Sequence, residues 1–81
     1  MGTDPYREAR VLARMLREQT LNDRAEKLDE CVAAGSTATE ILMGLRWHLR
    51  DLLATQPVTE ETRSVTVAIL TDVESLLERS D

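Results

Sequence analysis

One histidine, His48, and one cysteine, Cys31, supply the side chains best suited to proton transfer and thiol chemistry near neutral pH. On a helical projection His48 flanks an apolar face, which predicts a boundary histidine that hydrogen-bonds a neighbouring helix. Cys31 flanks another apolar stripe, which favours a small buried side chain over a thiolate activated by Arg24 and Lys27. No second histidine or cysteine completes a metal site, and no glycine-rich loop could hold a phosphate. We therefore expect no enzymatic activity and no cofactor, since an enzyme would need His48 and Cys31 to share a pocket with a carboxylate.

Carboxylates recur at spacings of three and four in the second quarter of the chain, at Asp23, Glu26 and Glu30. This spacing places them on one face of a helix, away from its apolar residues. A di-iron bundle would need inward-facing carboxylates and Glu-x-x-His motifs, and the sequence has no such motif. Two interpretations remain, a solvated face and an acidic patch that attracts a basic partner.

Residues 5–19 carry basic and apolar side chains on opposite faces. The apolar face holds Val11, Leu12, Met15 and Leu16. The basic face holds Arg7, Arg10, Arg14 and Arg17. Nucleic-acid binding is disfavoured, because the formal net charge is −5 and Trp47 is the only aromatic side chain expected at the surface for base stacking. We expect this basic face to pack against an acidic helix, of the same chain or of a partner.

The segment from 38 to 55 is apolar on two sides. Its main face holds Ile41, Leu42, Leu45, Leu49 and Leu52. Nearly opposite lie Met43, Trp47 and Ala54, with Arg46 and Arg50 beside them. Met, Trp and Arg are the residue types enriched at protein interfaces. Two alternatives follow: Trp47 fills an internal gap with its indole N–H hydrogen-bonded, or this side of the helix binds a partner or a second copy.

The elements that position these residues follow from apolar periodicity. Apolar side chains repeat at helical spacing over about 5–19, 21–34, 38–55 and 60–79. The chain has 81 residues, is 42% apolar and contains no phenylalanine, so its core must be aliphatic. We predict one domain, residues 1–81, folded as an all-α antiparallel bundle of four short amphipathic helices.

The boundary between the first two helices depends on the direction of their apolar stripes. The stripes of 5–19 and 21–34 lie on opposite sides of one straight helix, which predicts a break within 20–23. Thr20 or Asn22 would then cap the second helix. A single kinked helix is the alternative.

Capping residues predict the other helix ends. Asp4 before Pro5 is typical of a helix start, and Gly35 of a helix end in the left-handed conformation. Thr37 and Glu40 have the spacing of a capping box. Residues 64–69 also alternate with period two, as a strand does, but no partner strand is apparent, so we expect a helix there.

Location follows from cysteine usage and hydropathy. One cysteine cannot form an internal disulfide, which favours a reducing compartment. The N-terminal residues lack the apolar run of a signal peptide, and no stretch approaches the roughly 18–20 apolar residues of a membrane span. We expect a cytoplasmic protein that does not bind membranes, with a basic protein surface as a plausible partner.

The segment GSTATEILMGLRWHLRDLL, residues 35–53, resembles a stretch of small all-helical bacterial proteins, some similar in size and acidity to immunity proteins or antitoxins. With the acidic charge, this resemblance leads us to expect a bacterial protein-binding module of immunity or antitoxin type that inhibits a basic partner. The alternative is a homo-oligomeric structural or scaffold protein in which helix 38–55 pairs with itself. The expected partner-binding residues are Met43, Trp47 and Arg50 as anchors, with Arg46 beside them. Asp23, Glu26 and Glu30, or the acidic last helix, would steer association.

Overall fold

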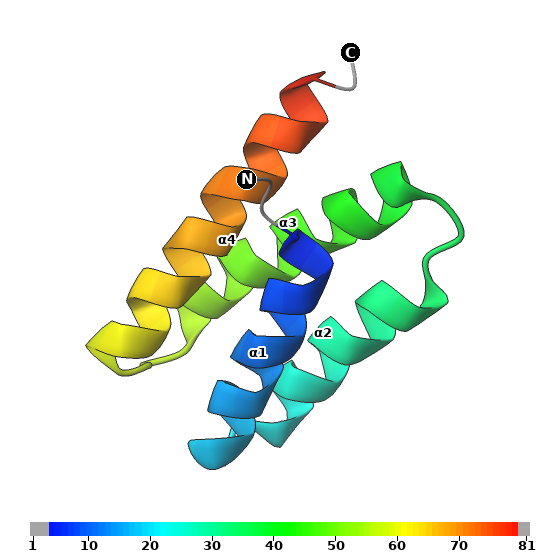
Figure 1. The fold of residues 1–81 in the computed structure, drawn as a ribbon. Coiled ribbons are helices and arrows are strands. Elements are labelled where there is room, and N and C mark those ends of the chain that lie inside the picture. Colours follow the sequence, from blue (N-terminus) through cyan, green and yellow to red (C-terminus); the bar gives the residue numbers. More distant parts are fainter. Residues whose placement is uncertain (1–3, 80–81) are drawn as a thin grey trace.

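The computed structural model describes residues 4–79, which form four helices (Figure 1). They are α1 (Pro5–Glu18), α2 (Asn22–Ala34), α3 (Ala38–Thr55) and α4 (Glu60–Arg79). The predicted all-α fold is confirmed, as is the break between the first two helices. Residues 64–69 lie within α4, and no strand occurs anywhere in the described part of the chain.

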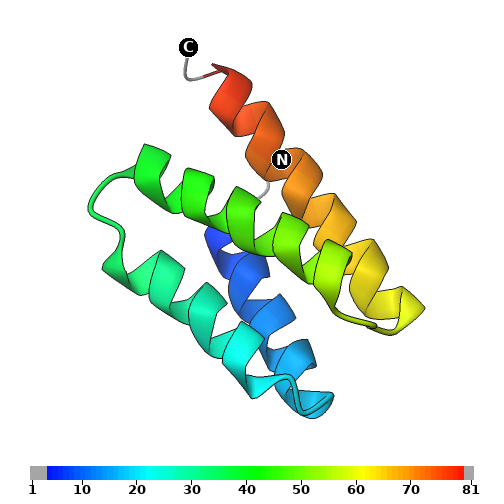
Figure 2. The same cartoon turned by 180° about the vertical axis from the view of Figure 1, so that it is seen from behind.

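The helices form a ring in which each packs against two neighbours. α1 packs most closely on α2 and α3 on α4, while α2 against α3 and α4 against α1 close the ring. Consecutive helices run in opposite directions, and α3 lies between α2 and α4 (Figures 1 and 2). This arrangement leaves one face of α3 turned away from the other three helices.

Aliphatic side chains fill the centre of the bundle. α3 contributes Leu42, Leu45, Leu49 and Leu52, and α4 contributes Ile69 and Val73. α1 contributes Leu12 and Leu16 as expected, but Val11 is 47% exposed and Ala13 is buried in its place. α1 packs against both α2 and α4, and its buried side chains follow the line Ala9, Leu12, Ala13 and Leu16, which leaves Val11 towards solvent.

Side-chain capping fixes the beginnings of α1 and α3 as predicted. The Asp4 carboxylate accepts hydrogen bonds from the backbone N–H groups of Tyr6 (3.1 Å) and Arg7 (3.3 Å). At α3, the Thr37 hydroxyl accepts from the backbone N–H of Glu40 at 3.1 Å. The Glu40 carboxylate accepts from the hydroxyl (2.6 Å) and backbone N–H (3.2 Å) of Ser36, and these bonds lower the pKa of Glu40.

The turn between α1 and α2 corrects the predicted cap. Neither Thr20 nor Asn22 caps α2; the capping position is Leu21, which has no side-chain hydrogen bond to offer. Thr20 instead takes a left-handed conformation with φ of 63°. The N–H of Leu21 donates to the Leu16 carbonyl and that of Thr20 to the Arg17 carbonyl, as in a Schellman motif. The turn is therefore organised by the end of α1.

Gly35 is required because a side chain would not fit there. The predicted reason, a left-handed conformation at the end of the helix, is wrong. The backbone of Gly35 is extended, with φ of −67° and ψ of 134°. A Cβ atom built there would lie 2.2 Å from Cγ1 of Ile41 and 3.3 Å from the carbonyl oxygen of Cys31. The glycine thus allows the chain to turn closely between α2 and α3.

Candidate protein-binding surface

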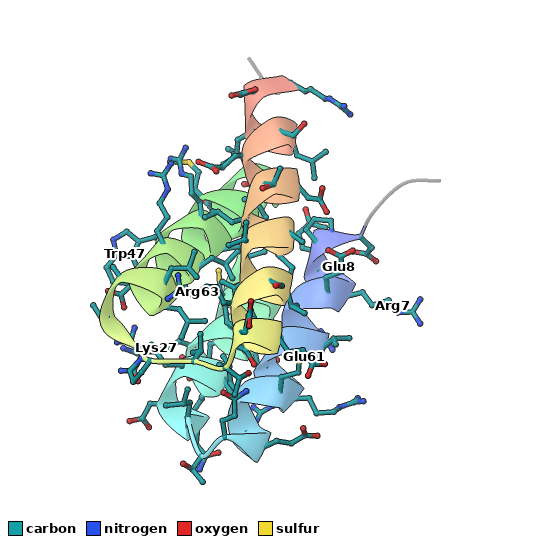
Figure 3. All side chains as sticks on the ribbon, turned by 90° about the vertical axis from the view of Figure 1, so that its left-hand side faces the viewer. Arg7, Glu8, Lys27, Trp47, Glu61 and Arg63 are labelled. Atoms are coloured by element: carbon teal, nitrogen blue, oxygen red, sulfur yellow. The ribbon has the colours of Figure 1, made fainter. Side chains whose placement is uncertain are left out.

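The outer face of α3 exposes two large apolar side chains. Trp47 is 61% exposed and Met43 is 49% exposed, whereas the four leucines on the opposite face are buried. Figure 3 shows Trp47 at the outer edge of α3, on the opposite side of the bundle from Arg7. The alternative in which Trp47 fills an internal gap is therefore wrong. The bundle packs without its single tryptophan.

Two shallow hollows lie on this face and share Met43, Arg46 and Arg50. The first, of about 510 Å³, runs along Trp47 and Ala54 on α3. The second, of about 530 Å³, lies between α3 and α4. We call this face the Trp47 surface; its lining residues are Thr39, Met43, Arg46, Trp47, Arg50, Asp51, Ala54, Glu74, Leu77 and Glu78.

Ion pairs hold α3 to both of its neighbours at this surface. Arg50 pairs with Glu74 of α4, and Asp51 pairs with Arg24 of α2. Arg24 also donates to the hydroxyl of Thr55, at 3.1 Å. These contacts link α3 to α2 and to α4 on either side of its exposed face.

Two charged residues of the surface have no ion-pair partner among residues 4–79. Arg46 lines both hollows, and Glu78 lines the one between α3 and α4. One is a cation on α3 and the other an anion on α4. The charges that remain available to another molecule are thus one of each sign, on two neighbouring helices that line the same hollow.

His48 lies half-buried beside the Trp47 surface. Its ring meets the Trp47 indole edge to face, with the centroids 5.1 Å apart and the planes at 90°. Burial lowers the pKa of His48, the charges of Lys27 and Arg24 lower it further, and Asp51 opposes them. His48 makes no hydrogen bond to any described residue, which corrects the predicted bond to a neighbouring helix.

Cys31 lies on α2, with its half-buried thiol directed at α3. Its thiol donates to the carbonyl oxygen of Ile41 at 3.6 Å, and burial raises its pKa. A Cβ atom built on Gly44 would lie 2.5 Å from its sulfur. The small cavity beside His48, of about 10 Å³, is not lined by Cys31. Within the described residues, no group of three His, Cys, Asp or Glu side chains could hold a metal ion.

The carboxylates predicted to steer a partner lie outside the Trp47 surface. Asp23, Glu26 and Glu30 are exposed on α2, and none of them lines either hollow. Asp51 of α3 lines this surface, and two further acidic side chains, Glu74 and Glu78, reach it from the acidic last helix. Sequence periodicity could not single out these two, because their place depends on how α4 packs on α3.

The arginine-rich face of α1 is only partly satisfied within the chain. Arg17 donates to Asp29 of α2 at 2.6 Å, as expected for packing against an acidic helix. Arg7, Arg10 and Arg14 are exposed. They lie on the outer side of α1, and none of them lines the hollows of the Trp47 surface.

The fold and the surface together define an all-α four-helix bundle with one exposed aromatic face. No helix within residues 4–79 is both long enough and apolar enough to cross a bilayer. Comparison of the chain with protein-family models, with curated protein sequences and with solved structures finds no match. The resemblance of residues 35–53 to small bacterial helical proteins therefore remains an expectation.

Proposed function

We propose that the protein is a small interaction module that binds another protein chain on the Trp47 surface. The observation that carries this proposal is the exposure of Trp47, at 61%, on a helix whose opposite face holds four buried leucines. Tryptophan, methionine and arginine are the side chains most enriched at interface centres, and all three occur here. In this proposal the chain catalyses no reaction.

Covering Trp47 would make a large contribution to association. A tryptophan side chain buries up to about 250 Å², so the exposed part corresponds to roughly 150 Å² and about 4 kcal/mol of transfer free energy. Its indole ring is already held edge-on to His48, which reduces the entropy lost on binding. We therefore expect Trp47 to be the largest single contributor to the binding energy.

An inhibitor of immunity or antitoxin type, acting on a basic protein in a bacterial cytoplasm, is the second form of this proposal. It is favoured by the net charge of −5 and by Asp23, Glu26 and Glu30, which are without ion-pair partners among residues 4–79. Because these carboxylates lie away from Trp47, they would accelerate encounter with a basic partner without contacting it at Trp47. The association rate should then fall as ionic strength rises, and a rate independent of salt contradicts this form.

The general proposal is tested by photo-crosslinking in cells. A photoreactive amino acid replaces Met43 in one variant and Val11, on α1, in a control. The two positions are matched in exposure, at 49% and 47%. We expect a crosslinked protein adduct of defined mass from position 43 and none from position 11. Equal adducts at both positions, or none at either, would contradict a specific binding surface on α3.

A further inference from the structure

We propose that the partner on the Trp47 surface is a second copy of this chain, related to the first by a two-fold axis. This inference rests on the proposed function, because it names the occupant of the same surface. A two-fold interface must be complementary to itself, so that every group on it finds its counterpart on an identical face. The shape and the charges of the Trp47 surface both meet this condition.

The shape combines a projection and a recess. Trp47 projects from the outer edge of α3 (Figure 3). Beside it, the hollow of about 530 Å³ between α3 and α4 has Met43 and Leu77 in its lining. When two such faces meet about a two-fold axis, the indole of each copy enters the hollow of the other. Each copy then buries its most exposed apolar side chain against Met43 and Leu77, between the charged groups that line the rest of the hollow.

The charged side chains of the Trp47 surface are also complementary to those of an identical surface. Arg50 and Glu74 neutralise each other within the chain, and so do Asp51 and Arg24. Arg46 and Glu78, one on each wall of the hollow, have no ion-pair partner within residues 4–79.

A two-fold axis brings Arg46 of each copy to Glu78 of the other, forming two equivalent pairs. A basic partner would require an excess of unpaired acidic groups here, and Glu78 is balanced by Arg46.

The small core of the four-helix bundle makes such pairing favourable. An 81-residue bundle has a small core, and domains of this size commonly gain stability by association. The buried side chains of this core are aliphatic, and the tryptophan lies outside it. Pairing would bury the indole without any change in the packing of the four helices.

Charge reversal in the purified full-length chain tests the two-fold relation. We expect the wild-type chain to sediment as a dimer. Arg46→Glu or Glu78→Arg alone should raise the dimer dissociation constant about tenfold, because each substitution breaks both symmetry-related ion pairs. The double variant should return to within about threefold of wild type, since both pairs re-form with reversed sign. In a complex with a different protein, the double reversal could not restore binding.

Matched controls separate this effect from net charge and from folding. Arg14→Glu on α1 and Glu30→Arg on α2 make the same charge changes at exposed positions without ion pairs, and should leave dimerisation within about threefold of wild type. Circular dichroism should show unchanged helicity in every variant. As a test of the anchor, Trp47→Ala should shift the population toward monomer.

Two results would overturn the second copy as partner. One is a wild-type chain that stays monomeric up to millimolar concentration, and the other is a double reversal of Arg46 and Glu78 that restores nothing. If the crosslinker at Met43 still yields an adduct with a different protein in either case, the interaction-module proposal stands and only self-pairing fails. If position 43 yields no adduct, both proposals fail.

Discussion

The substitution Gly44→Ala tests the close approach of α2 and α3 that sets the position of the Trp47 surface. Gly44 lies in the middle of α3, and a Cβ atom added there would meet the sulfur of Cys31 at 2.5 Å. Apart from the adjacent residues and the nearby backbone of α3 itself, no other atom lies within 4 Å of that position. The effect of the substitution should therefore depend almost entirely on whether residue 31 carries a sulfur atom.

Two opposing contributions determine how Gly44→Ala changes the free energy of unfolding. Alanine is favoured over glycine in a helix interior by about 1 kcal/mol. Overpacking against the sulfur costs about 1–3 kcal/mol, because Cys31 must leave its position and its hydrogen bond to Ile41. Gly44→Ala alone should therefore lower the free energy of unfolding by up to about 2 kcal/mol. In a Cys31→Ala background the same change should raise it by about 1 kcal/mol.

Urea denaturation of the four chains in this double-mutant cycle measures the coupling between the two positions. We expect a coupling free energy of about 1–3 kcal/mol, equal to the overpacking term. A change in the slope with urea would show an altered native or unfolded state and is checked in the same data. An equal effect of Gly44→Ala with and without the sulfur would contradict overpacking between the two positions.

Three further predictions concern stability. Burial and Lys27 hold the pKa of His48 below its usual 6.5, so the unfolded chain binds the proton more readily than the folded chain. The stability of the fold should therefore decrease as pH drops below about 6.5. In thermal melts, His48→Gln should flatten that dependence of stability on pH. Burial and neighbouring carboxylates raise the pKa of Glu8. Its contribution to stability is therefore favourable at acidic pH and is lost as pH rises through the pKa of the folded chain. Glu8→Gln should raise Tm at about pH 7 and have little effect at about pH 3. The Gln19 amide donates to Thr62 at 2.6 Å and to the Met15 carbonyl at 3.2 Å, so Gln19→Ala should cost about 1–2 kcal/mol in urea unfolding, and an unchanged midpoint would contradict this role.

The helices could be predicted from the sequence because their signals are local. Asp4 before Pro5 and Thr37 three residues before Glu40 each satisfy the first N–H groups of a helix within one turn of chain. The leucine stripe of 38–55 likewise marks the buried face of α3 at its own spacing. None of these signals depends on what lies across the bundle.

The turns were harder to predict because several local hydrogen bonds compete there. Thr20 has the side chain of a helix cap, but the Leu16 and Arg17 carbonyls at the end of α1 also needed donors, and the chain satisfies those. Gly35 has the freedom to be left-handed, yet its actual constraint comes from Ile41, six residues along. Sequence patterns list the candidates at such positions, and packing selects among them.

The Trp47 surface could be predicted only in part. The projection places Met43 and Trp47 together on one face of α3, and the structure confirms that grouping. It could not say whether a neighbouring helix covers that face. Nor could it bring Glu78 to the same hollow as Arg46, because the two residues belong to different helices. The carboxylates of α2 lie exposed on one helix, as predicted, and outside the two hollows of the Trp47 surface, and their predicted steering role stays a prediction.

The exposure of Trp47 is a consequence of the core and not of loose packing. Turning α3 to bury the indole would bring Leu42, Leu45, Leu49 and Leu52 into water. At about 1.5–3 kcal/mol for each leucine, the loss is about 6–12 kcal/mol, against a gain of about 4 kcal/mol for the indole. A loss of that size is comparable with the whole stability of a typical domain, about 5–15 kcal/mol. The ion pairs of α3 with Glu74 and Arg24 would also break. Rotation of α3 therefore cannot bury Trp47 at an acceptable cost. In the proposed function, a second molecule covers it.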